Sequence, residues 1–134
     1  MSIEVKYLSK IYGNQKAVDD ISFKVDDGEI VAFLGPNGAG KSTTMKIATG
    51  SLTPSSGTVF VNGMDVRTQP LAIKKDIGYL PEHNPLYLDM YVHEYLRFSG
   101  RFYDLSGKLL KSRIAAVIEL CQLTLEQNKL IGQL

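Results

Sequence analysis

The first part of the chain carries hydrophobic residues with the period of β-strands. Residues 2–8 (SIEVKYL) and residues 20–25 (DISFKV) alternate between apolar and polar side chains, which is typical of strands with one buried face. After a turn at residues 26–28, residues 29–34 (EIVAFL) form an almost continuous apolar run. We therefore expect two half-buried strands followed by a short buried strand.

The middle of the chain predicts one more strand and a short helix. A loop rich in Ser, Pro and Gly leads into residues 58–63 (TVFVNG), a strand pattern that closes at Asn62-Gly63. Residues 69–75 (QPLAIKK) can form a short helix with proline in its first turn. Residues 76–80 (DIGYL) are apolar and β-like, and a proline follows them.

From Asp89 onward the hydrophobic period lengthens to that of helices. Residues 89–103 predict a helix whose expected contact residues are Met90, Tyr91, Tyr95 and Phe98. Gly107 marks a break, and the next helix carries one apolar face formed by Leu110, Ile114, Val117, Ile118 and Cys121. Thr124 could cap a last short helix over residues 125–131.

One glycine-rich stretch points to chemistry. Residues 35–43 (GPNGAGKST) lie between the expected strand at 29–34 and a helix that can stop at Gly50, and they fit the spacing G-x-x-x-x-G-K-[ST]. Glycine lets several backbone N–H groups turn inward, and the following helix adds the positive end of its dipole. The pattern predicts a phosphate cradle rather than a glycine-rich turn beside an exposed lysine.

The same spacing assigns two side chains. Lys41 is expected to reach the β- and γ-phosphates of a nucleotide, and the Ser42 hydroxyl is expected to bind Mg²⁺.

Composition and charge narrow the class of protein. The chain has 134 residues, of which 44% are hydrophobic, enough for a sizeable core. Lys and Arg number 15 against 14 Asp and Glu, and without a basic stripe nucleic acid is not the expected ligand. The one cysteine, Cys121, is expected to be a small core residue, and its lack of a partner fits a reducing cytosol. No signal peptide and no apolar stretch of membrane-spanning length is present.

The motifs in their order resemble a known family. Tyr12-Gly13, AVDDISF, the cradle with its flanks, SSGTVFVNG and IGYLPE are similar to the N-terminal half of an ABC-type ATP-binding subunit. The YLPE sequence resembles the ABC-2 class of exporters, and residues 77–96 are similar to gliding-motility-associated ATP-binding subunits. The resemblance implies an α/β P-loop NTPase of ABC type, with an antiparallel β-subdomain, a partial parallel core and part of the helical subdomain. Residues 1–82 would form the nucleotide-binding core and residues 83–134 the partial helical subdomain.

The resemblance also implies roles for single residues in binding ATP. Tyr12 matches the aromatic residue that stacks on adenine, although by itself it could be a surface tyrosine that ends a strand. Val18 matches a small apolar residue beside the nucleoside. The cradle itself comprises Asn37, Gly38, Ala39, Gly40, Lys41, Ser42 and Thr43, with Thr43 near the α-phosphate.

Glu82 departs from the family pattern, which usually has glutamine there. The position implies contact with the metal or the attacking water, so Glu82 is a candidate catalytic and Mg²⁺-binding residue; alternatively it is a solvated loop carboxylate. Because a carboxylate repels a triphosphate unless Mg²⁺ lies between them, we expect a steeper dependence of nucleotide affinity on Mg²⁺ than with glutamine.

The region after Glu82 implies a protein partner. In the family it faces the coupling helix of a transmembrane permease subunit, so an apolar and aromatic set is either a partner surface or core: Leu86, Tyr87, Leu88, Met90, Tyr91 and Tyr95. His83 and His93 lack further metal ligands at useful spacing and are expected to be polar surface or capping groups.

Several family motifs do not occur in residues 83–134. These are the Walker B strand with its catalytic glutamate, the signature motif and the switch histidine. The chain therefore resembles a truncated subunit that binds Mg-ATP without turnover and self-associates through exposed strand edges. Its parent would be a dimeric ATPase on the inner face of the cell membrane. The alternative is a soluble ABC-type ATPase that acts on nucleic acid or the ribosome; the transported substrate stays open.

Overall fold

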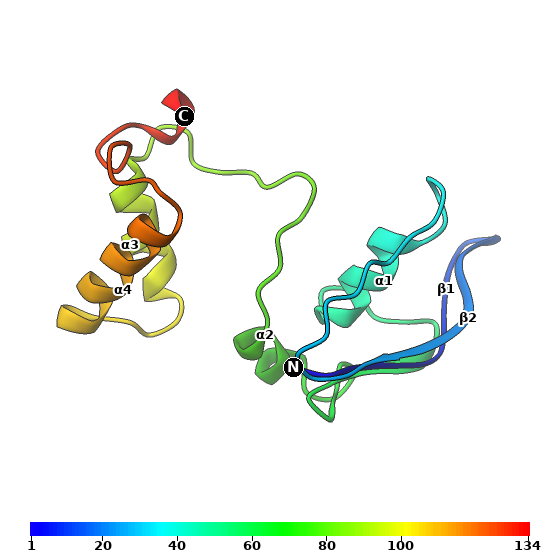
Figure 1. The fold of residues 1–134 in the computed structure, drawn as a ribbon. Coiled ribbons are helices and arrows are strands. Elements are labelled where there is room, and N and C mark those ends of the chain that lie inside the picture. Colours follow the sequence, from blue (N-terminus) through cyan, green and yellow to red (C-terminus); the bar gives the residue numbers. More distant parts are fainter. The chain divides into compact units, whose positions relative to one another are not determined.

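The alternating residues near the N-terminus form an antiparallel hairpin. In the computed structural model, which describes residues 1–134, β1 (Ile3–Tyr12) pairs with β2 (Gln15–Val25) (Figure 1). A two-residue turn at Gly13-Asn14 joins them, with a φ of 56° at Gly13. β1 includes residues 3–8 of the expected segment 2–8, and β2 includes all of residues 20–25. β2 begins five residues earlier than expected because its first residues pair with the end of β1.

Two further strands complete one antiparallel sheet. β3 (Ser56–Val61) pairs with the other side of β1, and β4 (Met64–Asp65) pairs with β3, giving the order β2-β1-β3-β4. The predicted Asn62-Gly63 turn is confirmed, since both residues have positive φ, as a type I′ hairpin turn requires.

Two helices bury the apolar face of this sheet. α1 (Lys41–Ala48) contacts β2 and β3, and α2 (Pro70–Asp76) contacts β4; both helices agree with the sequence prediction. The core they close comprises Val5, Leu8, Val18, Ile47, Ala48, Val59, Val61, Val66 and Ile73. The helix α1 packs directly on the antiparallel sheet, so its position does not depend on a strand at residues 29–34.

The expected strand at residues 29–34 is not formed, and this part of the prediction is wrong. The segment pairs with no other strand, Ile30 is fully exposed and Leu34 is 87% exposed. A strand exists only where a neighbour supplies the hydrogen-bond ladder, and no strand of this chain does so here. Residues 77–80 likewise form a loop rather than a strand, and Leu80 is exposed.

The structure consists of two compact units, Met1–Tyr79 and Leu80–Leu134. In the second unit α3 (Val92–Arg101) packs on α4 (Gly107–Leu120), with Leu110, Ile114 and Ile118 buried between them (Figure 1). The predicted face is confirmed for these three residues. Val117 is partly exposed, and Cys121 is exposed because α4 ends at Leu120, so the expectation of a core cysteine is wrong.

Residues 125–131 do not form the expected helix. They run in turns to a short 3-10 helix, η1 (Ile131–Gln133). The carbonyls of Gln127 and Lys129 accept the N–H groups of His93 and Val92, and the Ile131 N–H donates to the Met90 carbonyl. These main-chain groups therefore bond to residues at the start of α3. In a helix over residues 125–131 they would instead bond to one another.

Candidate nucleotide-binding site

The first turn of α1 has free backbone donors. Its N-cap is Gly40, which has a φ of 82° and supplies no side-chain cap. The N–H groups of Lys41, Ser42 and Thr43 consequently have no acceptor within the chain. Helices usually begin with a Ser, Thr, Asp or Asn cap that satisfies one such group. This helix therefore presents unpaired N–H groups and its positive dipole end to an external anion.

Gly40 fits tightly against β2. A Cβ atom at this position would lie 2.1 Å from the Ala17 carbonyl oxygen and 2.9 Å from Cγ2 of the buried Val18. Both this close approach and the left-handed φ require glycine. The contact holds the start of α1 against the β1–β2 hairpin.

Lys41 folds back over its own loop. Its Nζ donates hydrogen bonds to the carbonyl oxygens of Gly35 (2.5 Å) and Pro36 (2.7 Å). The ammonium makes no ion pair with any carboxylate. Its charge is thus held at the loop by neutral oxygens, which phosphate oxygens can replace with a stronger, charge-assisted interaction.

The other expected cradle residues lie on the same exposed loop. Asn37, Gly38 and Ala39 are exposed, and an added Cβ at Gly38 would meet nothing within 4 Å. The Ser42 hydroxyl is exposed and has no hydrogen-bond partner in the chain. The structure therefore brings Asn37 through Thr43 together beside Val18, with free donors at the loop and room for a ligand. These groups fit the polyphosphate of a nucleotide.

Thr44 was not among the expected site residues, yet it supports the loop. Its side chain is 1% exposed, and both its N–H (2.8 Å) and its Oγ1 (3.0 Å) donate to the Gly40 carbonyl. The signal in the sequence was a hydroxyl residue four positions after Gly40, where a threonine can bond back to the i−4 carbonyl.

Tyr12 lies at the end of β1 with half of its side chain exposed (50%). Lys10, two residues earlier on the same strand, pairs in register with Val18, the residue that Gly40 contacts. The hairpin thereby links the end of the strand that carries Tyr12 to the start of α1, within the first unit.

Glu82 belongs to the second unit and is exposed. Its carboxylate makes no hydrogen bond or ion pair. The structure therefore groups the two candidate metal ligands differently: Ser42 lies with the phosphate loop, and Glu82 lies with residues 80–134.

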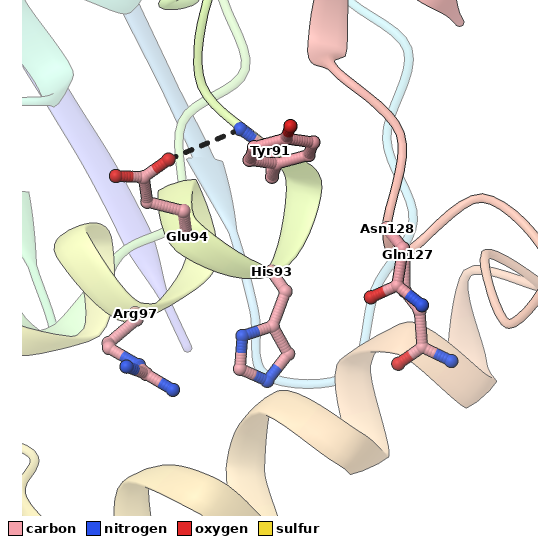
Figure 2. A pocket seen from close by; sticks show the side chains of 6 residues that line it. All are labelled: Tyr91, His93, Glu94, Arg97, Gln127 and Asn128. Carbon is pink, nitrogen blue, oxygen red and sulfur yellow. Dashed lines mark hydrogen bonds between the residues drawn. The ribbon is translucent and has the colours of Figure 1, made fainter.

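The second unit has a polar hollow of about 600 Å³ of its own (Figure 2). It is lined by Tyr91, His93, Glu94, Arg97, Gln127 and Asn128. Although it lies at the start of a helix, the carbonyls of Gln127 and Lys129 already accept the first N–H groups of α3, and the Glu94 carboxylate accepts the N–H of Tyr91. At this helix start, unlike that of α1, the N–H groups of the first two residues, Val92 and His93, are already paired with a returning segment and are not free for a phosphate.

Comparison with known proteins agrees with this geometry. The family model described as ABC transporter matches residues 18–134. The chain belongs to the ABC transporter family. Over 97% of its length it superposes on a solved "ATP binding subunit of ABC transporter" with a TM-score of 0.82 and 34% identity, covering 54% of that chain. The α/β fold of ABC ATP-binding domains, with its antiparallel β-subdomain and helices, is therefore confirmed.

Relatives within the ABC family include bacterial ABC transporter ATP-binding proteins. The chain is 40% identical over 117 residues to the probable multidrug ABC transporter ATP-binding protein YbhF of Escherichia coli, covering 87% of this chain and 20% of that protein. It is 38% identical over 130 residues to the ABC transporter ATP-binding protein YxlF of Bacillus subtilis, covering 97% and 42%. The chain thus spans less than half the length of these two relatives. None of its helices is both long and apolar enough to cross a bilayer.

Proposed function

We propose that the chain binds Mg-ATP through residues 37–43 and acts in the ATP-binding subunit of an ABC-2-type exporter. The observation that carries this proposal is the uncapped start of α1, with Lys41 held over the loop by two carbonyls. Among the relatives, YbhF is named for multidrug transport and SkfE of Bacillus subtilis, 35% identical over 132 residues, for peptide export. These names favour export, while the finer likeness to gliding-motility subunits stays a prediction.

Calorimetry with Mg-ATP tests the binding step. We expect wild-type chain to bind, and Lys41→Ala to lose binding because the cation facing the phosphates is removed. Lys46→Ala is the matched control, since Lys46 is an exposed lysine in the last turn of the same helix. Equal binding by both variants and wild type would contradict the proposal. Without a Walker B carboxylate in these residues, we expect binding without turnover.

Glu82 supplies a test of the metal. We propose that Ser42 and Glu82 are the Mg²⁺ ligands and that Tyr12 and Val18 hold the nucleoside. Titrating Mg²⁺ at constant ATP should give a steeper rise in affinity for wild type than for Glu82→Gln, because the amide does not repel the triphosphate. Identical Mg²⁺ dependence in the two proteins would refute the role of Glu82.

The second unit offers a surface for a permease subunit. A row of aromatic rings runs along α3 and the loop before it: Tyr87 lies 5.7 Å from Phe98, and Phe98 lies 5.0 Å from Phe102, between ring centroids. All three are exposed, which supports a partner surface over core for this region. We propose that a transmembrane permease subunit covers this row of aromatic rings and so holds the ATP-binding subunit at the inner face of the membrane. We also propose that two ATP-binding subunits form a dimer there. Loss of permease co-purification in Phe98→Ser, with Phe33→Ser as a control in the first unit, would support this.

The competing function is a soluble ABC-type ATPase that acts on nucleic acid or the ribosome. The chain's net charge of +1 does not favour that role, because proteins that bind nucleic acid usually carry a basic surface. Salt-sensitive binding to DNA or ribosomes, without permease co-purification, would favour this competing function.

The unpaired residues 29–34 also support the expected self-association of the chain, which sedimentation at several concentrations would detect.

A further inference from the structure

Lys10 is a half-buried lysine without a carboxylate partner. Its Nζ donates a 2.8 Å hydrogen bond to the Thr53 carbonyl and lies 5.2 Å from the centroid of the Tyr12 ring. Because the two side chains are two residues apart on β1, they stand on the same face of the strand. A partly desolvated cation is held in place by these two contacts alone, and the ring face is one of them.

The carbonyl that anchors Lys10 is itself fixed to β1. Thr53 lies in the loop that follows α1, and two residues later Ser55 is bonded to the strand in both directions. The Ser55 N–H donates to the Ser9 carbonyl (2.9 Å), and Ser55 Oγ accepts the N–H of Ile11 (3.0 Å). These two hydrogen bonds attach the loop to β1, and Lys10 connects the loop to the ring of Tyr12.

We propose that Lys10 is a positioning residue for the nucleoside base. It occupies one face of the Tyr12 ring and leaves the opposite face for adenine. The ammonium restricts the rotation of an otherwise half-exposed ring and withdraws electron density from it, which favours stacking on an electron-rich purine. The inference rests on the proposed function, because it requires Tyr12 to contact the base.

Two substitutions at Lys10 and two ligands test this role. Lys10→Met keeps the alkyl stem and removes the charge, whereas Lys10→Arg keeps a cation that can donate to Thr53. Calorimetry is run with Mg-ATP and with Mg-tripolyphosphate, which has the phosphates but no base. We expect Lys10→Met to weaken ATP binding roughly two- to fivefold and to leave tripolyphosphate binding unchanged. Lys10→Arg should keep the wild-type ratio of ATP affinity to tripolyphosphate affinity.

Lys6→Met is the matched control. Lys6 also lies 5.2 Å from an aromatic ring on the same sheet, that of Phe60, and its Nζ pairs with the Glu4 carboxylate at 3.0 Å. The Lys6→Met variant should bind both ligands as wild type does. Unchanged ATP affinity in Lys10→Met, or an equal loss for both ligands, would overturn the inference while leaving phosphate binding intact. Failure of wild-type chain to bind either ligand would instead refute the proposed function, and the inference with it.

Discussion

β1 (IEVKYLSKIY) carries apolar residues among polar ones, whereas residues 29–34 (EIVAFL) are an almost continuous apolar run. The sequence predicts a strand in both regions, but only β1 forms one. β1 pairs with β2 on one edge and β3 on the other, and Leu8 is completely buried. Residues 29–34 pair with nothing, and Ile30 is completely exposed. The difference lies in the neighbours, since main-chain pairing and burial both come from segments distant in sequence.

The unpaired stretch nevertheless borders an apolar groove of about 490 Å³ within the first unit. Val31 and Phe33 line it together with residues of β1, β2 and α1, and the Phe33 ring lies 5.3 Å from that of Phe23. One face of the stretch therefore has contacts with the sheet, and the other, with Ile30 and Leu34, has none. Residues 29–34 thus pack one face against the sheet although they share no main-chain hydrogen bonds with a neighbouring strand.

The largest effect should come from removing buried volume in the paired strand. Leu8→Ala is expected to lower the free energy of unfolding by about 2–5 kcal/mol, because it leaves a cavity in the core. Ile30→Ala, which removes a fully exposed side chain, should change it by less than about 0.5 kcal/mol. Urea unfolding of both variants measures the difference, and equal losses would show that residues 29–34 are as well packed as β1.

A glycine contrast tests how closely β3 approaches β1. A Cβ at Gly57 would lie 2.1 Å from the Tyr7 carbonyl oxygen, whereas at Gly63 it would meet nothing within 4 Å, and both residues have positive φ. Gly57→Ala should therefore destabilise by about 3 kcal/mol and Gly63→Ala by about 1 kcal/mol. Similar unfolding midpoints for the two variants would mean that β1 can shift away from Gly57.

The outer edge of the sheet should show a smaller effect that depends on pH. The hydrogen bond from the Arg67 side chain lowers the pKa of Asp65 on β4 to about 2, assisted by the Arg67 N–H and the Thr58 hydroxyl. Because the folded pKa lies below the ordinary value of 3.8, the stabilisation is present above about pH 4 and is lost as the pH falls toward 2.

Asp65 still has 16% of its side chain exposed, so solvent screening limits this contribution to about 1–2 kcal/mol. Asp65→Asn should be less stable than wild type at pH 6, and the two stabilities should converge toward pH 2. Parallel curves of stability against pH would show that Asp65 does not link β4 to the sheet in this way.

Most local features were predictable. Positive-φ glycines, the Asn62-Gly63 turn, α1 and α2, and the buried face of α4 follow from short-range preferences that the residues carry with them. The phosphate loop was predictable for the same reason, since its glycines and its lysine act through their own backbone and side chain.

Several of the missed features depend on partners far along the chain. Gly40 lies close to the Ala17 carbonyl, and Lys10 donates a hydrogen bond to the Thr53 carbonyl. The carbonyls of Gln127 and Lys129 accept the first N–H groups of α3, and residues 125–131 do not form a helix of their own. No periodicity within one segment contains that information.

The chain's residues alone specify a loop able to bind phosphate and a set of strand-like and helical segments. Tertiary structure decides which strand-like segments become strands, because a strand requires a neighbour to share its hydrogen bonds and cover its side chains. It also decides which helix start stays open to a ligand. α1 keeps its N–H groups free because glycine precedes it and no other segment reaches them, while the start of α3 is closed by a returning segment of the same unit.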